Sequence, residues 1–146
     1  KRQTLDRARV ALAAEMLGSA LEAFERTVAY LKEREQFGVK IGSFQALQHR
    51  AAHMQSRIEL CRSVVLQALT AVDETPEQLP LLASLAKTQL NALVKLVSNE
   101  AVQMHGGIGV TDELEIGFFL KRARATMQAF GDSGFHKDRY ATLCGY

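Results

Sequence analysis

The stretch AVQMHGGIGV, residues 101–110, ends a long apolar helical pattern and begins a turn. Gly106 and Gly107 are adjacent, and glycine tolerates a positive φ and lets a foreign surface come close to the backbone. Gln103 and His105, just before them, add side-chain hydrogen-bond donors and acceptors. The stretch therefore predicts a helix end, which is compatible with a plain C-terminal cap or with a turn that faces a ligand.

Three long helical segments precede this turn. Residues 5–34 contain no proline, and their apolar residues recur in steps of four and three, which predicts one long helix with a single apolar stripe. A second helix is predicted from Phe44 to about Val72. A third is predicted to begin with Thr75 as N-cap and Pro76 at its first position, and to run to the glycines.

Two shorter helices are predicted after the glycine turn. Thr111 or Asp112 can cap the first of them, and Asp132 or Ser133 can cap the last, which extends through Tyr140. Four main helices with short connections predict an all-α fold: an antiparallel up-down four-helix bundle with a short extra C-terminal helix.

Composition narrows the class of protein. With 146 residues, 47% of them apolar and 23% charged, the chain suits one soluble globular domain. The net charge of +2 is too small to favour nucleic acid or a membrane surface as partner. Cys61 and Cys144 have no paired spacing, so we expect free thiols and a cytoplasmic location. His49 and His53 share a helix face but have no third ligand nearby, so no metal site is predicted.

The segment REQFGVKIG, residues 34–42, interrupts the helical pattern between the first two helices. One interpretation is a connecting loop whose Phe37 plugs the end of the core. The other is a ligand-binding turn in which Arg34 and Gln36 present donors to an anion or a ring. The spacing of these residues alone favours the connecting loop.

Taken together, the turns resemble a known family. REQFG at residues 34–38, QALQ at 45–48, QMHGGIG at 103–109 and an aromatic–glycine turn at Phe130 and Gly131 occur in this order. In order and spacing the chain resembles the C-terminal domain of the acyl-CoA dehydrogenases over essentially its whole length, residues 1–146. Family members carry an N-terminal helical domain and a middle β-domain before this bundle, and both are absent from this chain.

The resemblance implies that FAD binds across a subunit interface. Arg34, Gln36 and Phe37 match the segment that reaches the pyrophosphate and adenine side of a neighbouring subunit's FAD, and a guanidinium binds phosphate oxygens bidentately. The other positions that match FAD-contacting segments are Gln45, Gln103, Gly106, Gly107 and Ser133.

The resemblance also implies the substrate and the reaction, which removes an α-proton from an acyl-CoA thioester while a hydride passes from the β-carbon to the flavin. Asp6, Arg9 and Phe130 match positions on the acyl-CoA side of the site. The general base is a glutamate in most members, and Gly131 occupies its position here; a minority carry it on the first helix, where this chain has Ala8. The carboxylate of Asp132, one residue further on, is the candidate base, with the N-cap of the last helix as its alternative role.

Two hypotheses follow from the resemblance. In the first, the chain is the FAD-binding, oligomer-forming domain of an acyl-CoA dehydrogenase that is inactive as an isolated domain. That enzyme would pass its electrons to an electron-transferring flavoprotein and would form a homodimer or homotetramer. In the second, Ala8 and Gly131 mark a non-catalytic subunit of a mixed oligomer, which lends Arg34 to the flavin of a neighbour.

Overall fold

The computed structural model describes residues 2–110 and 115–146. The predicted caps Thr111 and Asp112 lie outside the described residues. The elements, in chain order, are α1 (Arg2–Glu33), β1 (Glu35–Gln36), β2 (Val39–Lys40), the 3-10 turn η1 (Ile41–Ser43), α2 (Gln45–Asp73), α3 (Leu79–His105), the 3-10 turn η2 (Gly106–Val110), α4 (Ile116–Gln128) and α5 (Ser133–Leu143).

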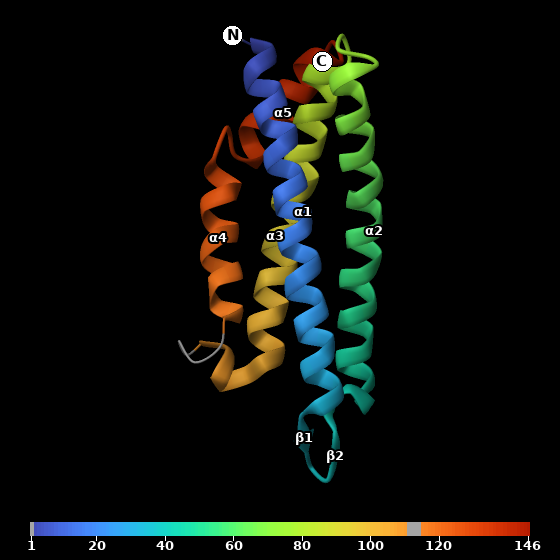
Figure 1. The fold of residues 1–146 in the computed structure, drawn as a ribbon, viewed down its shortest axis with the longest axis vertical. Helices are drawn as coiled ribbons and strands as arrows, with labels where there is room; N and C mark the ends of the chain where they lie inside the picture. The colour runs from blue at the N-terminus through green and yellow to red at the C-terminus, as the bar shows by residue number, and fades with distance from the viewer. Residues whose placement is uncertain (1, 111–114) are drawn as a thin grey trace.

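The helices form the predicted antiparallel bundle. α1, α2, α3 and α4 run up and down beside one another, and the short α5 lies at the end of the bundle that holds the N-terminus (Figure 1). The hairpin of β1 and β2 lies at the opposite end, close to the end of α3. The all-α fold with an extra C-terminal helix is therefore confirmed.

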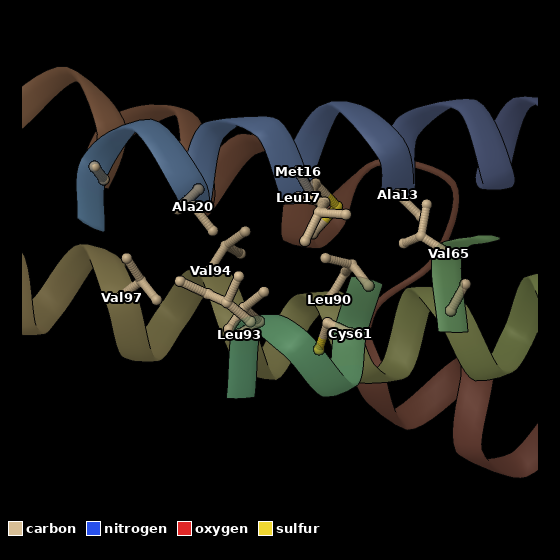
Figure 2. Packing of buried hydrophobic residues seen from close by; sticks show 14 of the residues in the cluster. Ala13, Met16, Leu17, Ala20, Cys61, Val65, Leu90, Leu93, Val94 and Val97 are labelled. Atoms are coloured by element: carbon tan, nitrogen blue, oxygen red, sulfur yellow. The ribbon is translucent and has the colours of Figure 1, made fainter. Parts of the chain in front are cut away.

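α3 is the centre of the fold, because it packs against each of the other four helices that the structure describes. Its sequence is apolar around most of its circumference, as expected for a helix surrounded by others. Figure 2 shows how its side chains interdigitate with those of α1 and α2. The residues labelled there are all buried: Ala13, Met16, Leu17, Ala20, Cys61, Val65, Leu90, Leu93, Val94 and Val97.

The start of α3 differs from the prediction. Thr75 and Pro76 belong to a turn, closed by the hydrogen bond from Gln78 N–H to the Thr75 carbonyl at 2.9 Å, and the regular helix begins only at Leu79. Pro80 occupies the first turn, where a missing N–H leaves no helical hydrogen bond unmade. Two prolines four residues apart offered two plausible starts, and the helix begins at the second of them.

Candidate functional site

Residues 34–42 form a tight β-hairpin. Gln36 pairs with Val39 across a two-residue turn in which Phe37 has φ 55° and Gly38 has φ 77°, the pair of positive values that the type I′ hairpin requires. The Phe37 side chain is 91% exposed, so the interpretation that it plugs the core is wrong. Its ring instead contacts that of Phe44, with the centroids 6.2 Å apart.

Hydrogen bonds fix this hairpin to the bundle. The Ile41 N–H donates to the Arg34 carbonyl at 2.9 Å, and the Gln48 side chain donates to the Gly42 carbonyl at 2.9 Å. The backbone at Gly42 lies so close to α1 that a Cβ there would come within 2.8 Å of the Leu31 carbonyl oxygen. The hairpin is therefore held in one position although most of its residues are exposed.

The glycine turn at the end of α3 lies beside the hairpin. Gly106 has φ 66°, which ends the helix, and the preceding His105 is anchored by the contact of its Nδ1 with the Ala101 carbonyl at 2.7 Å. The His105 ring stacks on Tyr30 of α1 with the centroids 4.3 Å apart. This stack joins the end of α3 to the last turns of α1.

A groove of about 460 Å³ separates the hairpin from the glycine turn. Within the part of the chain that the structure describes, no carboxylate pairs with the Arg34 guanidinium, and a Cβ on Gly106 or Gly107 would meet nothing within 4 Å. The groove thus has one cation and an open backbone surface. It is lined by Tyr30, Arg34, Gln36, Ile41, Met104, His105, Gly106, Gly107 and Ile108.

The predicted cofactor residues therefore divide into two groups. Four of them, Arg34, Gln36, Gly106 and Gly107, line this groove. The remaining predicted positions do not: Gln45, Gln103 and Phe37 are exposed at the same end of the bundle, and Ser133, the first residue of α5, lies at the opposite end.

The predicted substrate residues lie at the α5 end, where they bind one another. Asp6 is 1% exposed, and its carboxylate accepts hydrogen bonds from Arg9 at 2.8 Å and from Arg139 Nη2 at 2.9 Å, while Arg139 Nη1 lies 2.8 Å from Oδ1 in the same ion pair. The Arg9 Nε donates to the Phe130 carbonyl at 3.0 Å. Asp6 and Arg9 also border a cavity of about 580 Å³, whose wall includes Phe135 and Arg139.

The turn between α4 and α5 has no room for a side chain at Gly131. This glycine has φ 113°, and a Cβ there would lie 2.4 Å from Cδ1 of Phe135 and 2.9 Å from Nε2 of His136. Asp132 is the N-cap of α5, since its Oδ1 accepts the Phe135 N–H at 2.8 Å; the predicted cap is confirmed. Ala8, at the other position for a base, is half-buried on α1.

Two buried titratable residues near this turn were not predicted. The Lys87 ammonium donates to the Thr126 carbonyl at 2.7 Å, and burial, together with the charge of Arg9, lowers its pKa to about 8. Burial and the same arginine lower the pKa of His136 to about 4. Lys87 lies four residues after Ala83 and three before Leu90, which are both buried, so it falls on the same apolar face of α3. This period in the sequence could have predicted that Lys87 is buried.

Among the described residues no helix combines the length and apolarity needed to cross a membrane. In the same residues no three histidine, cysteine or acidic side chains come together in a way that would hold a metal ion.

Comparisons with known proteins agree on one family. Residues 1–142 match the family "Acyl-CoA dehydrogenase, C-terminal domain". The chain is 40% identical to acyl-CoA dehydrogenase IpdE2 of Mycolicibacterium smegmatis over 126 residues, which are 86% of this chain and 39% of that protein. It is 33% identical to the mitochondrial short/branched chain specific acyl-CoA dehydrogenase of Bos taurus over 121 residues, 83% of this chain and 28% of that protein.

A solved structure shows the same fold. The butyryl-CoA dehydrogenase from Megasphaera elsdenii superposes with a TM-score of 0.92 and 29% identity, over 98% of this chain and 37% of that chain. This chain therefore spans less than two fifths of the length of each of these three relatives.

Proposed function

Because this chain belongs to the acyl-CoA dehydrogenase family, as its C-terminal domain, we propose that the protein containing it catalyses the α,β-dehydrogenation of an acyl-CoA thioester with FAD as cofactor. In this proposal the chain supplies contacts to the ADP and pyrophosphate part of FAD and a surface for oligomer formation. FAD, when bound, accepts the hydride that leaves the β-carbon.

The groove between the hairpin and the glycine turn is the observation that carries the proposal. Arg34 lines this groove and has no carboxylate partner among the described residues, and a guanidinium can bind two phosphate oxygens. Gly106 and Gly107 leave the opposite wall open, so that a flat dinucleotide can approach the backbone. Gln36 also lines this groove, and Phe37, Gln45 and Gln103 are exposed at the same end of the bundle. Together with Ser133 at the α5 end they are the remaining proposed contacts.

An arginine variant tests this assignment in the full-length protein. Arg34→Ala removes the proposed phosphate contact, and we expect the affinity for FAD to fall by about 10- to 100-fold, since a hydrogen-bonded charge pair contributes about 1.5–3 kcal/mol. The flavin absorbance that remains per protomer after gel filtration measures this loss of affinity. The matched control is Arg62→Ala, on an exposed part of α2 outside the groove. Equal flavin content in wild type and Arg34→Ala would remove Arg34 from the cofactor site.

The base that takes the α-proton is the second element of the proposal. Only Oδ1 of Asp132 is used by the helix cap, and Oδ2 has no hydrogen-bond partner among the described residues. Asp132 is therefore proposed as the base, unless a carboxylate outside the chain takes this role. Asparagine is as good an N-cap as aspartate but cannot accept the proton. Asp132→Asn should abolish dye-linked oxidation of acyl-CoA and leave flavin content intact; unchanged turnover would exclude Asp132 as the base.

One observation favours a second candidate function, that of a non-catalytic subunit in a mixed oligomer. Gly131 stands where most family members have their base, and its positive φ and the Phe135 ring leave no space for a side chain there. The subunit would still lend Arg34 to the flavin of a neighbour. Co-expression with a neighbouring gene separates the candidates: activity found only in the mixed complex supports this function, and activity of the protein alone excludes it.

The partners follow from the same proposal. An acyl-CoA is the substrate, and Asp6, Arg9 and Phe130 lie on its side of the site. An electron-transferring flavoprotein is the proposed electron acceptor. The proposed assembly is a homodimer or homotetramer, or the mixed oligomer of the second candidate, in a cytoplasmic location, with the isolated domain inactive.

A further inference from the structure

The backbone carbonyl of Phe130 is held by two donors from different helices. Phe130 has φ 58°, a left-handed conformation that is unfavourable for a residue with a Cβ. Its carbonyl oxygen accepts a hydrogen bond from Arg9 Nε of α1 at 3.0 Å and contacts His136 Nε2 of α5 at 3.1 Å. The strained residue is therefore restrained from both sides, immediately before Gly131.

The neighbours of His136 determine where its proton resides. A carbonyl oxygen only accepts, so His136 Nε2 carries the proton that is donated to Phe130. In the neutral ring Nδ1 then has a lone pair, and it lies 3.3 Å from the Ser84 hydroxyl of α3. The Ser84 oxygen accepts from Arg139 Nη1 at 2.9 Å, which leaves its own proton available for His136. Arg139 Nη1 also donates to the Pro80 carbonyl at 3.1 Å, so each donor of this series has an acceptor.

The hydrogen bonds close into a ring. Arg139 Nη2 donates to Asp6 at 2.9 Å, Asp6 accepts from Arg9 at 2.8 Å, and Arg9 donates to the Phe130 carbonyl at 3.0 Å. This closed ring of hydrogen bonds joins α1, α3 and α5 to the α4–α5 turn. His136 and Ser84 are fully buried, so the bond between them lies in the interior, whereas the Arg139 side chain is 21% exposed.

We propose that His136, oriented by Ser84 and Arg139, is a positioning residue that holds the Phe130–Gly131 turn in its left-handed conformation as long as its ring is neutral. A protonated ring would keep the Nε2 donor to Phe130, but its Nδ1 could no longer accept the Ser84 proton, so the orientation of the ring by Ser84 would be lost. The positioning itself requires no flavin. Its relevance to turnover rests on the proposed function, since the turn carries Asp132.

The charged groups that act on His136 oppose its protonation. Arg9 on α1, Lys87 on α3 and Arg139 on α5 are cationic and lower its pKa, and the carboxylate of Asp6 on α1 is bound by two of these cations, Arg9 and Arg139. Burial is the largest cause of the lowered pKa, and these cations add to it. A folded-state pKa of about 4, against an ordinary value of 6.5, means that the neutral ring persists well below neutral pH.

Two variants of similar size separate positioning from core packing. In the full-length protein, His136→Gln places an amide N–H near the position of Nε2, whereas His136→Leu keeps the apolar volume and has no donor. Hydrogen exchange, followed by mass spectrometry on peptides from residues 129–135, measures how often the turn opens. We expect at least about tenfold faster exchange in His136→Leu and less than about twofold in His136→Gln, with α2 peptides unchanged in both.

Ser84→Ala and a pH series complete the test. Ser84→Ala removes the donor to Nδ1, and exchange of the same peptides should rise by a few-fold. Exchange in the wild type, corrected for its intrinsic pH dependence, should stay constant down to about pH 5.5 and increase as the pH approaches 4, and His136→Gln should lack this increase. His136→Leu with wild-type exchange of the turn would overturn the proposal, and so would a wild-type pH series without the rise. Flavin content and turnover are measured separately, so that failure of the proposed function leaves this result unaffected.

Discussion

Replacement of Lys87 by methionine should flatten the pH dependence of folding free energy in this domain. The Lys87 ammonium is fully buried, and it donates to the Thr126 carbonyl at 2.7 Å and to Asn91 Oδ1 at 3.3 Å. Burial, followed by the charge of Arg9, lowers its pKa from 10.5 to about 8. The folded state therefore disfavours the charged form of this side chain.

The sign and the size of the effect follow from the two pKa values. Between about pH 8 and 10.5 the unfolded chain keeps the Lys87 proton and the folded chain loses it, so the unfolded state binds more protons and stability rises with pH. The full shift corresponds to about 3 kcal/mol, of which about 2.5 kcal/mol is gained between pH 7 and pH 10.

Urea unfolding of residues 1–146, followed by far-UV circular dichroism at several pH values from about 7 to 10, measures this gain. Other groups titrate in the same range, so the informative quantity is the difference between the wild type and Lys87→Met. Lys95→Met is the matched control, because it is the same substitution on the exposed side of the same helix. Wild-type and Lys87→Met curves that run parallel over this range would refute the reasoning.

Core packing and glycine positions give two more predictions, both measured as free energies of unfolding in urea at neutral pH. Leu90→Ala, at a fully buried position of α3, should cost about 3 kcal/mol, whereas Leu66→Ala, at a position 65% exposed, should change stability by less than about 0.5 kcal/mol. Gly109→Ala should destabilise by about 1–3 kcal/mol, because its Cβ would lie 2.7 Å from the Val102 carbonyl oxygen. Gly18→Ala should stabilise by up to about 1 kcal/mol, since it lies inside α1 and a Cβ there meets nothing within 4 Å. Equal changes in stability for the two leucine variants, or for the two glycine variants, would contradict the packing described at those positions.

The long helices were predictable from local pattern. The apolar period of residues 5–34, the glycines at 106 and 107, and the cap at Asp132 each depend on neighbours in the sequence, and the structure has all three features. The start of α3 was misplaced, because Thr75 and Pro76 satisfy the local rules for a helix start equally well. Only packing of the whole bundle decides between the two candidate starts.

The candidate site was predicted in part. The resemblance of the motifs implied a common role for Arg34, Gln36, Gly106 and Gly107, and the structure places these four around one groove. The hydrogen-bonded ring could not be found in this way. It joins Asp6 to Arg139 over 133 positions of sequence, and no local rule relates residues that far apart. Which groups donate and which accept in such a network can be assigned only when the buried residues and their partners are known.

The attachment of the hairpin to the bundle has a consequence for any ligand of the groove. A flexible loop loses about 1–2 kcal/mol of backbone conformational entropy per residue when a ligand immobilises it. Residues 34–42 have already lost that freedom on folding, because the bonds from Ile41 and Gln48 hold the segment in place. A ligand that Arg34 recognises thus meets a preorganised surface, and less of the favourable contact energy is spent on ordering the chain.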